Sequence, residues 1–228
     1  MSNSIFITGT GTDIGKTYVS GLIVKKLKDY GFKSSYYKAA MSGNLRDEKS
    51  NLIPGDAKFV KDISGIDQPL NEMCNYVYEN AVSPHLAAKI EGNPVDLDVA
   101  VERFNEVKEK SDFVTVEGSG GILCPLRFDH EYKFSLEDFI KKCNLSCILV
   151  ADAGLGTINN VVLTHYYMKN NGLKLKGIIF NNYIPEDIMQ EDNIKMCKYL
   201  TGLNVLACVK KDDKDIDIKK EDFEKIYE

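Results

Sequence analysis

Apolar and polar positions follow two rhythms along the chain. Short, continuously apolar runs, as at residues 5–8 and 147–151, are typical of buried strands in a parallel sheet. Between such runs, apolar residues recur at three- and four-residue spacing, as at residues 16–30, which is typical of helices that cover a sheet. The alternation of the two patterns predicts an α/β fold with a mainly parallel sheet and helices on both faces.

Caps and turn residues divide the chain into individual elements. Beyond the first run, strands are expected over residues 34–38, 112–117, 147–151, 175–180 and 204–209. Helices are expected over residues 16–30, 97–110, 134–142, 157–170 and 186–200, with one more ending near residue 62 and another starting at Ser83-Pro84. Asp56 and Asp96 are the expected N-caps of the helices that they precede.

Three further segments complete this division of the chain. The polar stretch at residues 44–54 is expected to be a mobile loop. The charged residues 210–228 are expected to form only a surface helix. Because no repeat, linker or break in composition is visible, we expect residues 1–228 to form a single domain.

Composition narrows the classes of function. The 228 residues are 43% hydrophobic and carry a net charge of −5, so no basic field indicates nucleic acid or an anionic membrane as a partner. The first strand begins almost at the N-terminus, and no apolar run reaches the length of a membrane span, so we expect neither a signal peptide nor a membrane segment. The six cysteines lack zinc-site or redox-motif spacing, which favours reduced thiols in a cytoplasmic protein.

The stretch after the first strand reads Thr8-Gly9-Thr10-Gly11-Thr12-Asp13-Ile14-Gly15-Lys16-Thr17. A glycine-rich turn that ends in Gly-Lys-Thr between a strand and a helix is typical of a phosphate-binding loop, because glycine lets backbone N–H groups approach a phosphate. Lys16 would then lie between the β- and γ-phosphates of a nucleotide, and the Thr17 hydroxyl would bind Mg²⁺. The usual spacing has glycine at position 10, where this chain has threonine, and an incidental glycine-rich turn is the alternative interpretation.

Other polar residues stand at or near the ends of predicted strands. Ligands of parallel sheets bind at the carboxyl ends of the strands. We therefore expect five residues to converge there: Lys16, Lys38, Glu117, Gly156 and Asn181. Thr17, Asp56 and Glu117 offer the oxygen ligands that Mg²⁺ prefers, and two lysines can neutralise a γ-phosphoryl group and its attacker. The simpler alternatives are that Asp56 only caps a helix and that Lys38 is a solubilising charge.

Covalent catalysis is not indicated by the sequence. His85 follows Ser-Pro at a helix start, where a capping or packing role is expected, and His130 and His165 are interpreted as surface residues. No serine or cysteine stands in a nucleophile-elbow context.

With these residues collected, the chain resembles the dethiobiotin synthetase family from the first strand to about residue 182. Besides the loop at residues 8–17, the resemblance rests on these segments in order: Tyr37-Lys38, Ser42-Gly43, Gly55-Asp56-Ala57, Ser83-Pro84-His85, Val116-Glu117-Gly118-Ser119-Gly120-Gly121, Pro125-Leu126, Gly156-Thr157-Ile158-Asn159 and Asn181. The family's own loop carries the same extra residue, which explains the shifted first glycine.

The resemblance implies a P-loop NTPase-like fold and an ATP- and Mg²⁺-dependent ligase of biotin synthesis. Its substrates would be 7,8-diaminopelargonic acid and CO₂ or bicarbonate, which close to the cyclic urea dethiobiotin. In the family scheme one amine becomes a carbamate, the carbamate attacks the γ-phosphoryl group, and the second amine closes the resulting carbamic–phosphoric anhydride.

The resemblance also implies a role for each matching residue. Lys16 and Lys38 would be catalytic, and Thr17, Asp56 and Glu117 would hold the metal ion. The nucleotide would be bound by Asp13, Ile14, Gly15, Lys16, Thr17, Tyr18, Asp56, Glu117, Gly118, Ser119, Gly120, Asn181 and Asn182. The substrate would be bound by Ser42, Gly156, Thr157 and Asn159, of which the last three come from the other subunit in the family, so a homodimer is implied.

The chain departs from the family after the last strand. The family's Gly-x-Ile-Pro, which contacts the base, is replaced by Ala207-Cys208-Val209-Lys210, so the preference for adenine does not follow from the resemblance. Two other classes of P-loop protein are alternatives. Amidases that act on cobyrinic acid carry a fused glutaminase domain for which this chain has no room. Partition-type switch ATPases, which act through a protein partner, place a lysine early in the loop, where this chain has Gly9-Thr10-Gly11.

Overall fold

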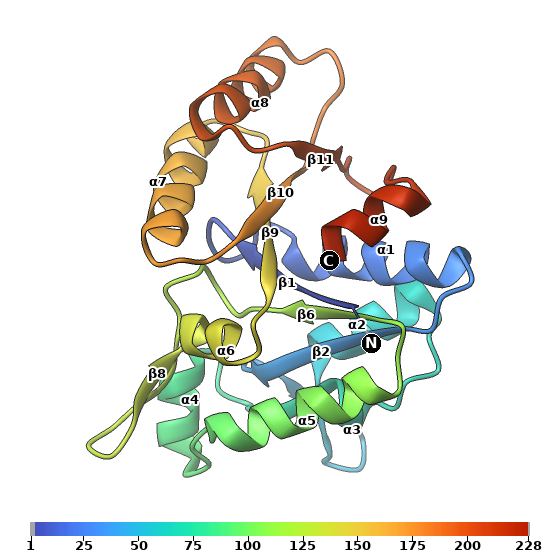
Figure 1. Cartoon of the computed structure of the whole chain (residues 1–228). Coiled ribbons are helices and arrows are strands. Elements are labelled where there is room, and N and C mark those ends of the chain that lie inside the picture. Colours follow the sequence, from blue (N-terminus) through green and yellow to red (C-terminus); the bar gives the residue numbers. More distant parts are fainter. Residues whose placement is uncertain (1–2, 228) are drawn as a thin grey trace.

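A seven-stranded sheet runs through the protein, and the computed structural model describes residues 3–227 of it (Figure 1). The strands, in spatial order, are β11 (Val205–Cys208), β10 (Leu175–Asn181), β9 (Ser146–Asp152), β1 (Asn3–Gly9), β6 (Phe113–Glu117), β2 (Ser34–Met41) and β5 (Cys74–Val77). Each neighbouring pair in this order is parallel. The α/β fold with a mainly parallel sheet is therefore confirmed.

Helices cover both faces of the sheet. The elements are α1 (Lys16–Asp29), α2 (Gly55–Ser64), α3 (Leu70–Met73), α4 (Pro84–Glu91), α5 (Leu97–Glu109), α6 (Leu136–Lys142), α7 (Thr157–Asn170), α8 (Ile188–Thr201) and α9 (Lys220–Tyr227). Figure 1 shows α5 and α6 on one side of the sheet and α1 on the other. Asp96 caps α5 as expected, because its carboxylate accepts hydrogen bonds from the backbone N–H groups of Asp98 and Val99.

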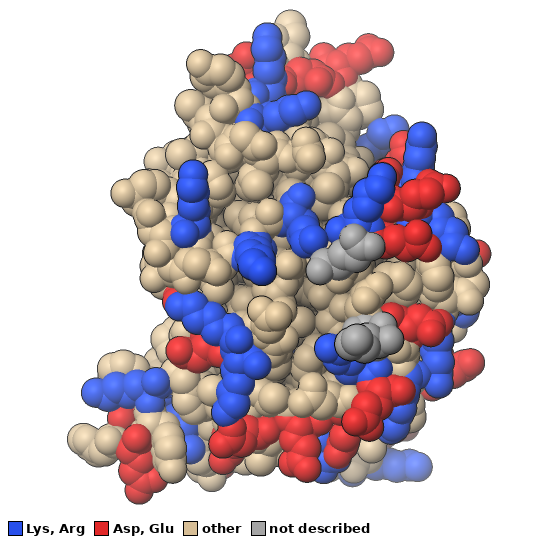
Figure 2. All heavy atoms as spheres, in the orientation of Figure 1, with Lys and Arg blue, Asp and Glu red and all other residues tan. Residues whose placement is uncertain are grey.

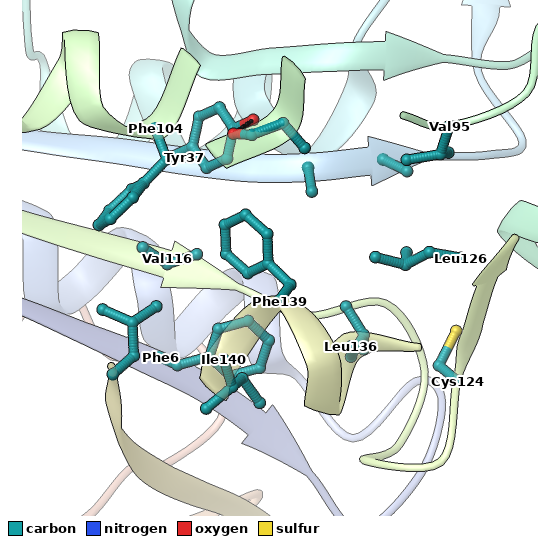
Figure 3. Packing of buried hydrophobic residues seen from close by; sticks show 14 of the residues in the cluster. Phe6, Tyr37, Val95, Phe104, Val116, Cys124, Leu126, Leu136, Phe139 and Ile140 are labelled. Atoms are coloured by element: carbon teal, nitrogen blue, oxygen red, sulfur yellow. Dashed lines mark hydrogen bonds between the residues drawn. The ribbon is translucent and has the colours of Figure 1, made fainter. Parts of the chain in front are cut away.

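The central strands are apolar on both sides because both faces are covered. On β1, Phe6 packs towards α5 and α6, whereas Ile5 and Ile7 pack towards α1. The first of these layers is rich in aromatic rings, and Figure 3 shows Tyr37, Phe104 and Phe139 packed together within it.

Several expected boundaries are wrong because pairing between strands overrides local pattern. Strand β2 continues to Met41 instead of ending at residue 38, because β5 pairs with it along the sheet edge. Residues 44–54, expected to be a loop, contain a hairpin of β3 (Leu45–Arg46) and β4 (Leu52–Ile53). Helix α6 begins at Leu136 rather than at residue 134, because β8 (Lys133–Ser135) pairs with β7 (Pro125–Phe128).

The expectation for the C-terminal segment is also wrong. Helix α9 buries Phe223, Ile226 and Tyr227 against the same layer that holds α1, so it is part of the core rather than a surface helix. The segment before it crosses α1, where Tyr30 donates a hydrogen bond to the carbonyl oxygen of Ile218 at 2.9 Å. The composition of a charged segment does not reveal a short amphipathic helix within it, because three apolar residues are enough to anchor two turns of helix.

Charged side chains are spread over the surface. Figure 2 shows Lys and Arg interspersed with Asp and Glu on the face in view. Within residues 3–227, no helix is long and apolar enough to cross a membrane. The six cysteines form no disulfide, as expected, and four of them are buried.

Candidate active site

The glycine-rich turn lies at the carboxyl end of β1 and leads directly into α1. Its last residue, Gly15, has φ of 91° and precedes the first helical residue, Lys16. A Cβ atom on Gly15 would lie 2.0 Å from Nδ2 of Asn181, and one on Gly9 would lie 2.4 Å from the end of Ile14. Glycine at these two positions therefore avoids a clash within the loop, and it also leaves the backbone accessible.

Lys16 folds back over this turn. Its ammonium group donates a 2.8 Å hydrogen bond to the carbonyl oxygen of Gly11, and the residue is only 7% exposed. Burial lowers the pKa of Lys16 from its usual value, although the negative charge of Glu117 acts in the opposite direction. A buried lysine held across a glycine-rich turn, at the N-terminus of a helix, is placed to receive a polyphosphate.

Lys38 lies between two carboxylates. Its Nζ atom is 2.6 Å from Oδ2 of Asp56 and 2.8 Å from Oε1 of Glu117. Burial alone would lower the pKa of Lys38, but the attraction of Glu117 and Asp56 outweighs it and raises the pKa above its usual value. Lys38 is therefore a paired buried cation rather than a solubilising surface charge.

Asp56 does not cap helix α2, so this expectation is wrong. The N-cap is Pro54, whose carbonyl oxygen accepts the first helical hydrogen bond, and Asp56 is the second residue of the helix. The Asp56 carboxylate is therefore free to turn towards Lys38 instead of towards its own backbone.

Glu117 is the most enclosed group of the site. Its side chain is 0% exposed, and its Oε1 atom accepts a second hydrogen bond, at 2.8 Å, from the Thr17 hydroxyl. The other oxygen, Oε2, accepts a hydrogen bond from the hydroxyl of Tyr36 at 3.0 Å. Burial, followed by the charge of Glu117, raises the pKa of Tyr36 well above its usual value, so the tyrosine keeps its proton and donates.

Tyr36 was missed in the sequence, although a signal for it exists. Side chains of a strand alternate between faces, so residues 36 and 38 point to the same side of β2. The register pairs Tyr36 with Thr115 on β6, which places Tyr36 one pleat behind the position where Lys38 meets Glu117.

These groups line one cleft of about 560 Å³ at the carboxyl ends of the strands. It is lined by residues of the turn, of the start of α1, of β2 and the residue after it, of α2, and of the end of β6 with the segment that follows: Thr12, Asp13, Gly15, Lys16, Thr17, Tyr18, Lys38, Met41, Ser42, Asp56, Phe59, Glu117, Ser119 and Gly120. The structure thus brings together the three expected metal ligands and most of the residues expected to bind the nucleotide, although Asn181 and Asn182 do not line the cleft. Of the expected substrate-binding residues, only Ser42 lines it.

Glycine and serine after β6 also hold the cleft in shape. A Cβ atom on Gly118 would lie 2.8 Å from the ring of Phe6, so this glycine permits the β6 end to pack against β1. The Ser119 hydroxyl donates a 2.8 Å hydrogen bond to the carbonyl oxygen of Ala40, which ties the segment to β2. The hydroxyl of Ser42, another lining residue, donates a 2.6 Å hydrogen bond to the carbonyl oxygen of Val82.

Asn181 and Asn182 have different surroundings. Nδ2 of Asn181 donates to the carbonyl oxygen of Ile14 at 3.0 Å, whereas its buried Oδ1 has no hydrogen-bond partner among the described residues. A buried acceptor without a partner fits a ligand that carries an N–H donor, such as a purine amine. The amide of Asn182 is directed instead to Asp152, 2.6 Å away.

Gly156 does not converge with the other strand-end residues, so that expectation is wrong within one chain. Gly156, Thr157 and Asn159 start helix α7 and are not among the residues that line the cleft. Their turn is held by Asn193, whose amide donates to the carbonyl oxygens of Ala153 and Gly154 at 3.0 Å each.

The donor set fits a nucleotide-bound Mg²⁺ ion. Within residues 3–227, no group of three or more His, Cys, Asp or Glu side chains is arranged to hold a metal. The carboxylates of Asp56 and Glu117 meet at the Lys38 ammonium group, and the Thr17 hydroxyl contacts Glu117. These three oxygen donors suit a hard cation that keeps further positions for phosphate and water. His85 lies outside this cleft at the start of α4, in keeping with a packing role.

Solved structures with the same fold include a cell division complex and an ATPase. A chain of the MinC:MinD cell division protein complex of Aquifex aeolicus matches over 93% of this chain and 83% of that chain, with a TM-score of 0.57 at 12% identity. A ParA family ATPase of Chlorobium tepidum covers 92% and 84%, with a TM-score of 0.55 at 11% identity. At such low identity the likeness concerns the fold alone, which is that of P-loop NTPases.

Sequence relatives identify the family. Residues 3–216 match the family described as an AAA domain. The ATP-dependent dethiobiotin synthetase BioD of Clostridium novyi is 49% identical over 209 residues, which span 92% of this chain and 87% of the relative. The enzyme of the same name from Brachyspira hyodysenteriae is 47% identical over 222 residues, which span 95% and 98%. The resemblance seen in the motifs is thereby confirmed: this chain belongs to the family of ATP-dependent dethiobiotin synthetases and is an ATP-dependent ligase of biotin biosynthesis.

Proposed function

We propose that this protein closes 7,8-diaminopelargonic acid and CO₂ into dethiobiotin, with Mg²⁺ and ATP bound in the cleft at the carboxyl ends of β1, β2 and β6. The observation that supports this most strongly is the buried cluster of Lys38, Asp56 and Glu117 beside the phosphate-binding turn. Together with Lys16, this cluster contains two positive and two negative side chains, whose charges cancel. The cleft can therefore accept anions together with a divalent cation.

The first step proposed is attack by a carbamate on the γ-phosphoryl group. One amine of the substrate adds to CO₂ and loses a proton, which gives the carbamate anion. A carbamate oxygen then bonds to the γ-phosphorus while the bond to ADP breaks, leaving a carbamic–phosphoric anhydride. Since both reactants are anions, their repulsion is the main obstacle, and Lys16 and Lys38 lower it by offering fixed positive charge on either side.

The second step proposed closes the ring. The remaining amine attacks the carbonyl carbon of the anhydride, a carbon–nitrogen bond forms, and inorganic phosphate leaves as the amine loses its proton. Mg²⁺, when bound by Thr17, Asp56 and Glu117, neutralises charge on the phosphates. The Ser42 hydroxyl at the cleft mouth is placed to hold the reacting amine or carbamate.

The nucleotide is proposed to lie along the turn with its base towards Asn181. Residues 13–18 would hold the phosphates, with the Gly118–Gly120 segment on the opposite wall. The unpartnered Oδ1 of Asn181 supports base recognition on this side. Asn182 is a proposed contact of the same base, although its amide here holds Asp152.

Binding of the substrate carboxylate is proposed to need a second subunit. Gly156, Thr157 and Asn159 present a helix N-terminus outside the chain's own cleft, which suits an anion that approaches from another chain. Asn159, Leu163 and Tyr166 are spaced by four and three residues and so share one face of α7. Leu163 and Tyr166 are 59% and 67% exposed, and Leu155 just before the helix is 91% exposed, which supports a homodimer through this face.

The direct test measures phosphate release from Mg·ATP and bicarbonate with and without 7,8-diaminopelargonic acid. We expect release that depends on the diamine, with dethiobiotin formed in equal amount. Slow release that is indifferent to the diamine would contradict the proposal and favour a switch ATPase that acts through a protein partner.

Shared sites are tested by mixing two inactive variants. Lys16→Ala and Asn159→Ala should each abolish turnover, and their mixture should regain roughly a quarter of wild-type activity, because half of the dimers are mixed and each then has one intact site. A mixture that stays inactive after demonstrated subunit exchange would show that each site is built from one chain.

A further inference from the structure

The carboxylate of Glu117 is held from two opposite sides. Its Oε1 atom faces the cleft and accepts hydrogen bonds from Lys38 and Thr17, both at 2.8 Å. Its Oε2 atom faces away from the cleft and accepts one hydrogen bond, at 3.0 Å, from the hydroxyl of Tyr36. Among the described residues, Tyr36 is the only hydrogen-bond donor to that oxygen.

Tyr36 is itself fixed at both ends. Its ring and hydroxyl are fully buried on the face of β2 that carries Lys38, packed with α2 and Met73. Its backbone N–H donates to the side-chain carbonyl of Gln68 at 2.9 Å, and its carbonyl oxygen accepts from the Gln68 amide at 3.0 Å. Gln68 thus pairs with this stretch of β2 much as a neighbouring strand would, just before the pairing with β5 begins at Lys38.

The terminal torsion of a glutamate is broad and roughly two-fold, so a buried carboxylate held at one oxygen alone can still rotate. A hydrogen bond to the far oxygen removes that freedom. We propose that Tyr36 is a positioning residue for Mg²⁺, whose hydroxyl fixes Oε2 of Glu117 and so presents Oε1 to the space shared with Thr17 and Asp56. The inference rests on the metal site of the proposed function and adds to it a residue that does not touch the cleft.

The decisive variant is Tyr36→Phe, which keeps the ring and removes only the donor. Loss of a hydrogen-bond partner behind a metal ligand typically weakens metal affinity by about 10- to 100-fold. We therefore expect Mn²⁺, used as a spectroscopic substitute for Mg²⁺, to bind the complex with a non-hydrolysable ATP analogue at least tenfold more weakly, as measured by electron paramagnetic resonance. Binding of the same analogue without metal should change less than twofold, because Lys16 and the turn are untouched.

Tyr37 provides a matched control on the same strand. It is equally buried, but it points to the opposite face, where its hydroxyl donates to the carbonyl oxygen of Ala100 at 2.8 Å. Figure 3 shows its ring near Phe104 and Phe139, in the layer that contains α5 and α6. Tyr37→Phe also removes one buried hydrogen bond, so any purely structural effect on stability is matched, and Mn²⁺ affinity should stay at the wild-type value.

Glu117→Gln separates failure of the inference from failure of the proposed function. If Glu117→Gln and Tyr36→Phe both weaken Mn²⁺ binding while Tyr37→Phe does not, the inference holds. If Glu117→Gln weakens Mn²⁺ binding and Tyr36→Phe binds as the wild type does, the inference is overturned and the metal site stands. If Glu117→Gln leaves Mn²⁺ binding unchanged, the metal site itself is wrong, and the inference is overturned with it.

A second variant decides the matter if Tyr36→Phe does not fold. Gln68→Ala releases the backbone of Tyr36 without altering the tyrosine or the cleft. We expect it to weaken Mn²⁺ binding severalfold with nucleotide binding retained, and unchanged Mn²⁺ binding in this variant would overturn the inference.

Discussion

Replacing Lys38 by methionine removes the positive charge between two carboxylates while keeping a side chain of similar length. Glu117 would lose its 2.8 Å ion pair, and because its side chain is 0% exposed, water could not replace the lost cation. The Asp56 side chain is 37% exposed and can be solvated instead. Removing one partner of a buried ion pair costs about 3–5 kcal/mol. Because the hydroxyls of Thr17 and Tyr36 remain on Glu117, we expect the lower end, about 3 kcal/mol.

The change is measured as a shift of the thermal unfolding midpoint by circular dichroism. For a protein of this size, 1 kcal/mol corresponds to about 2–4 °C, so Lys38→Met should lower the midpoint by about 6–12 °C. Adding Glu117→Gln should recover more than half of the loss, because a neutral amide no longer needs a counter-charge. Lys58→Met serves as control, since the pair of Lys58 with Asp62 is more than half exposed on both sides and should shift the midpoint little.

A midpoint for Lys38→Met within 2 °C of the wild type would refute this reasoning, since it would mean that Glu117 needs no buried cation. A double variant less stable than Lys38→Met would refute it as well, because the two residues would then not act as a pair.

Three further predictions concern the turn and the C-terminal helix. Lys16→Ala should reduce diamine-dependent phosphate release by at least about 10²–10³-fold, the usual loss for one preorganised charge-stabilising group, with an unchanged far-ultraviolet spectrum; retained turnover would contradict the phosphate assignment. Gly15→Ala should abolish binding of a fluorescent ATP analogue, because its Cβ atom would lie 2.0 Å from Asn181 at a φ of 91°, and normal binding would show that the turn does not receive the nucleotide. Phe223→Ala should lower the free energy of unfolding in urea by about 3–5 kcal/mol, whereas Lys225→Ala on the same helix should change it by less than about 0.5 kcal/mol, and equal effects would mean that α9 is not part of the core.

The sequence predicted those features of the site that depend on local pattern. A strand, a glycine-rich turn and a helix follow one another within residues 3–29, so Lys16 and Thr17 could be placed from spacing alone. Glu117 could be placed because a carboxylate that ends an apolar strand must find a partner.

Other features depend on neighbours that are distant in the chain. The local pattern predicts that Asp56 caps a helix, because a short polar residue before an apolar stretch commonly does so, whereas its actual partner is Lys38, 18 residues earlier. Alternation along β2 places Tyr36 on the same face as Lys38, but only the register of β2 and β6 shows that it lies behind Glu117. The edge strand β5 has only four residues and therefore too little periodicity to be recognised.

The central position of β1 in the sheet has a consequence for folding during synthesis on the ribosome. Asn3 pairs with Phe113, so the first strand to be synthesised waits for about 110 further residues before its nearest partner exists. At about 5–20 residues per second, that delay is about 5–20 s. The second partner, β9, comes later still, and α9, which packs in the same layer as α1, follows it. The nascent chain thus carries an apolar strand without its two neighbours while about half of the described residues are made, and the cleft stays incomplete until Glu117 at the end of β6 has been added.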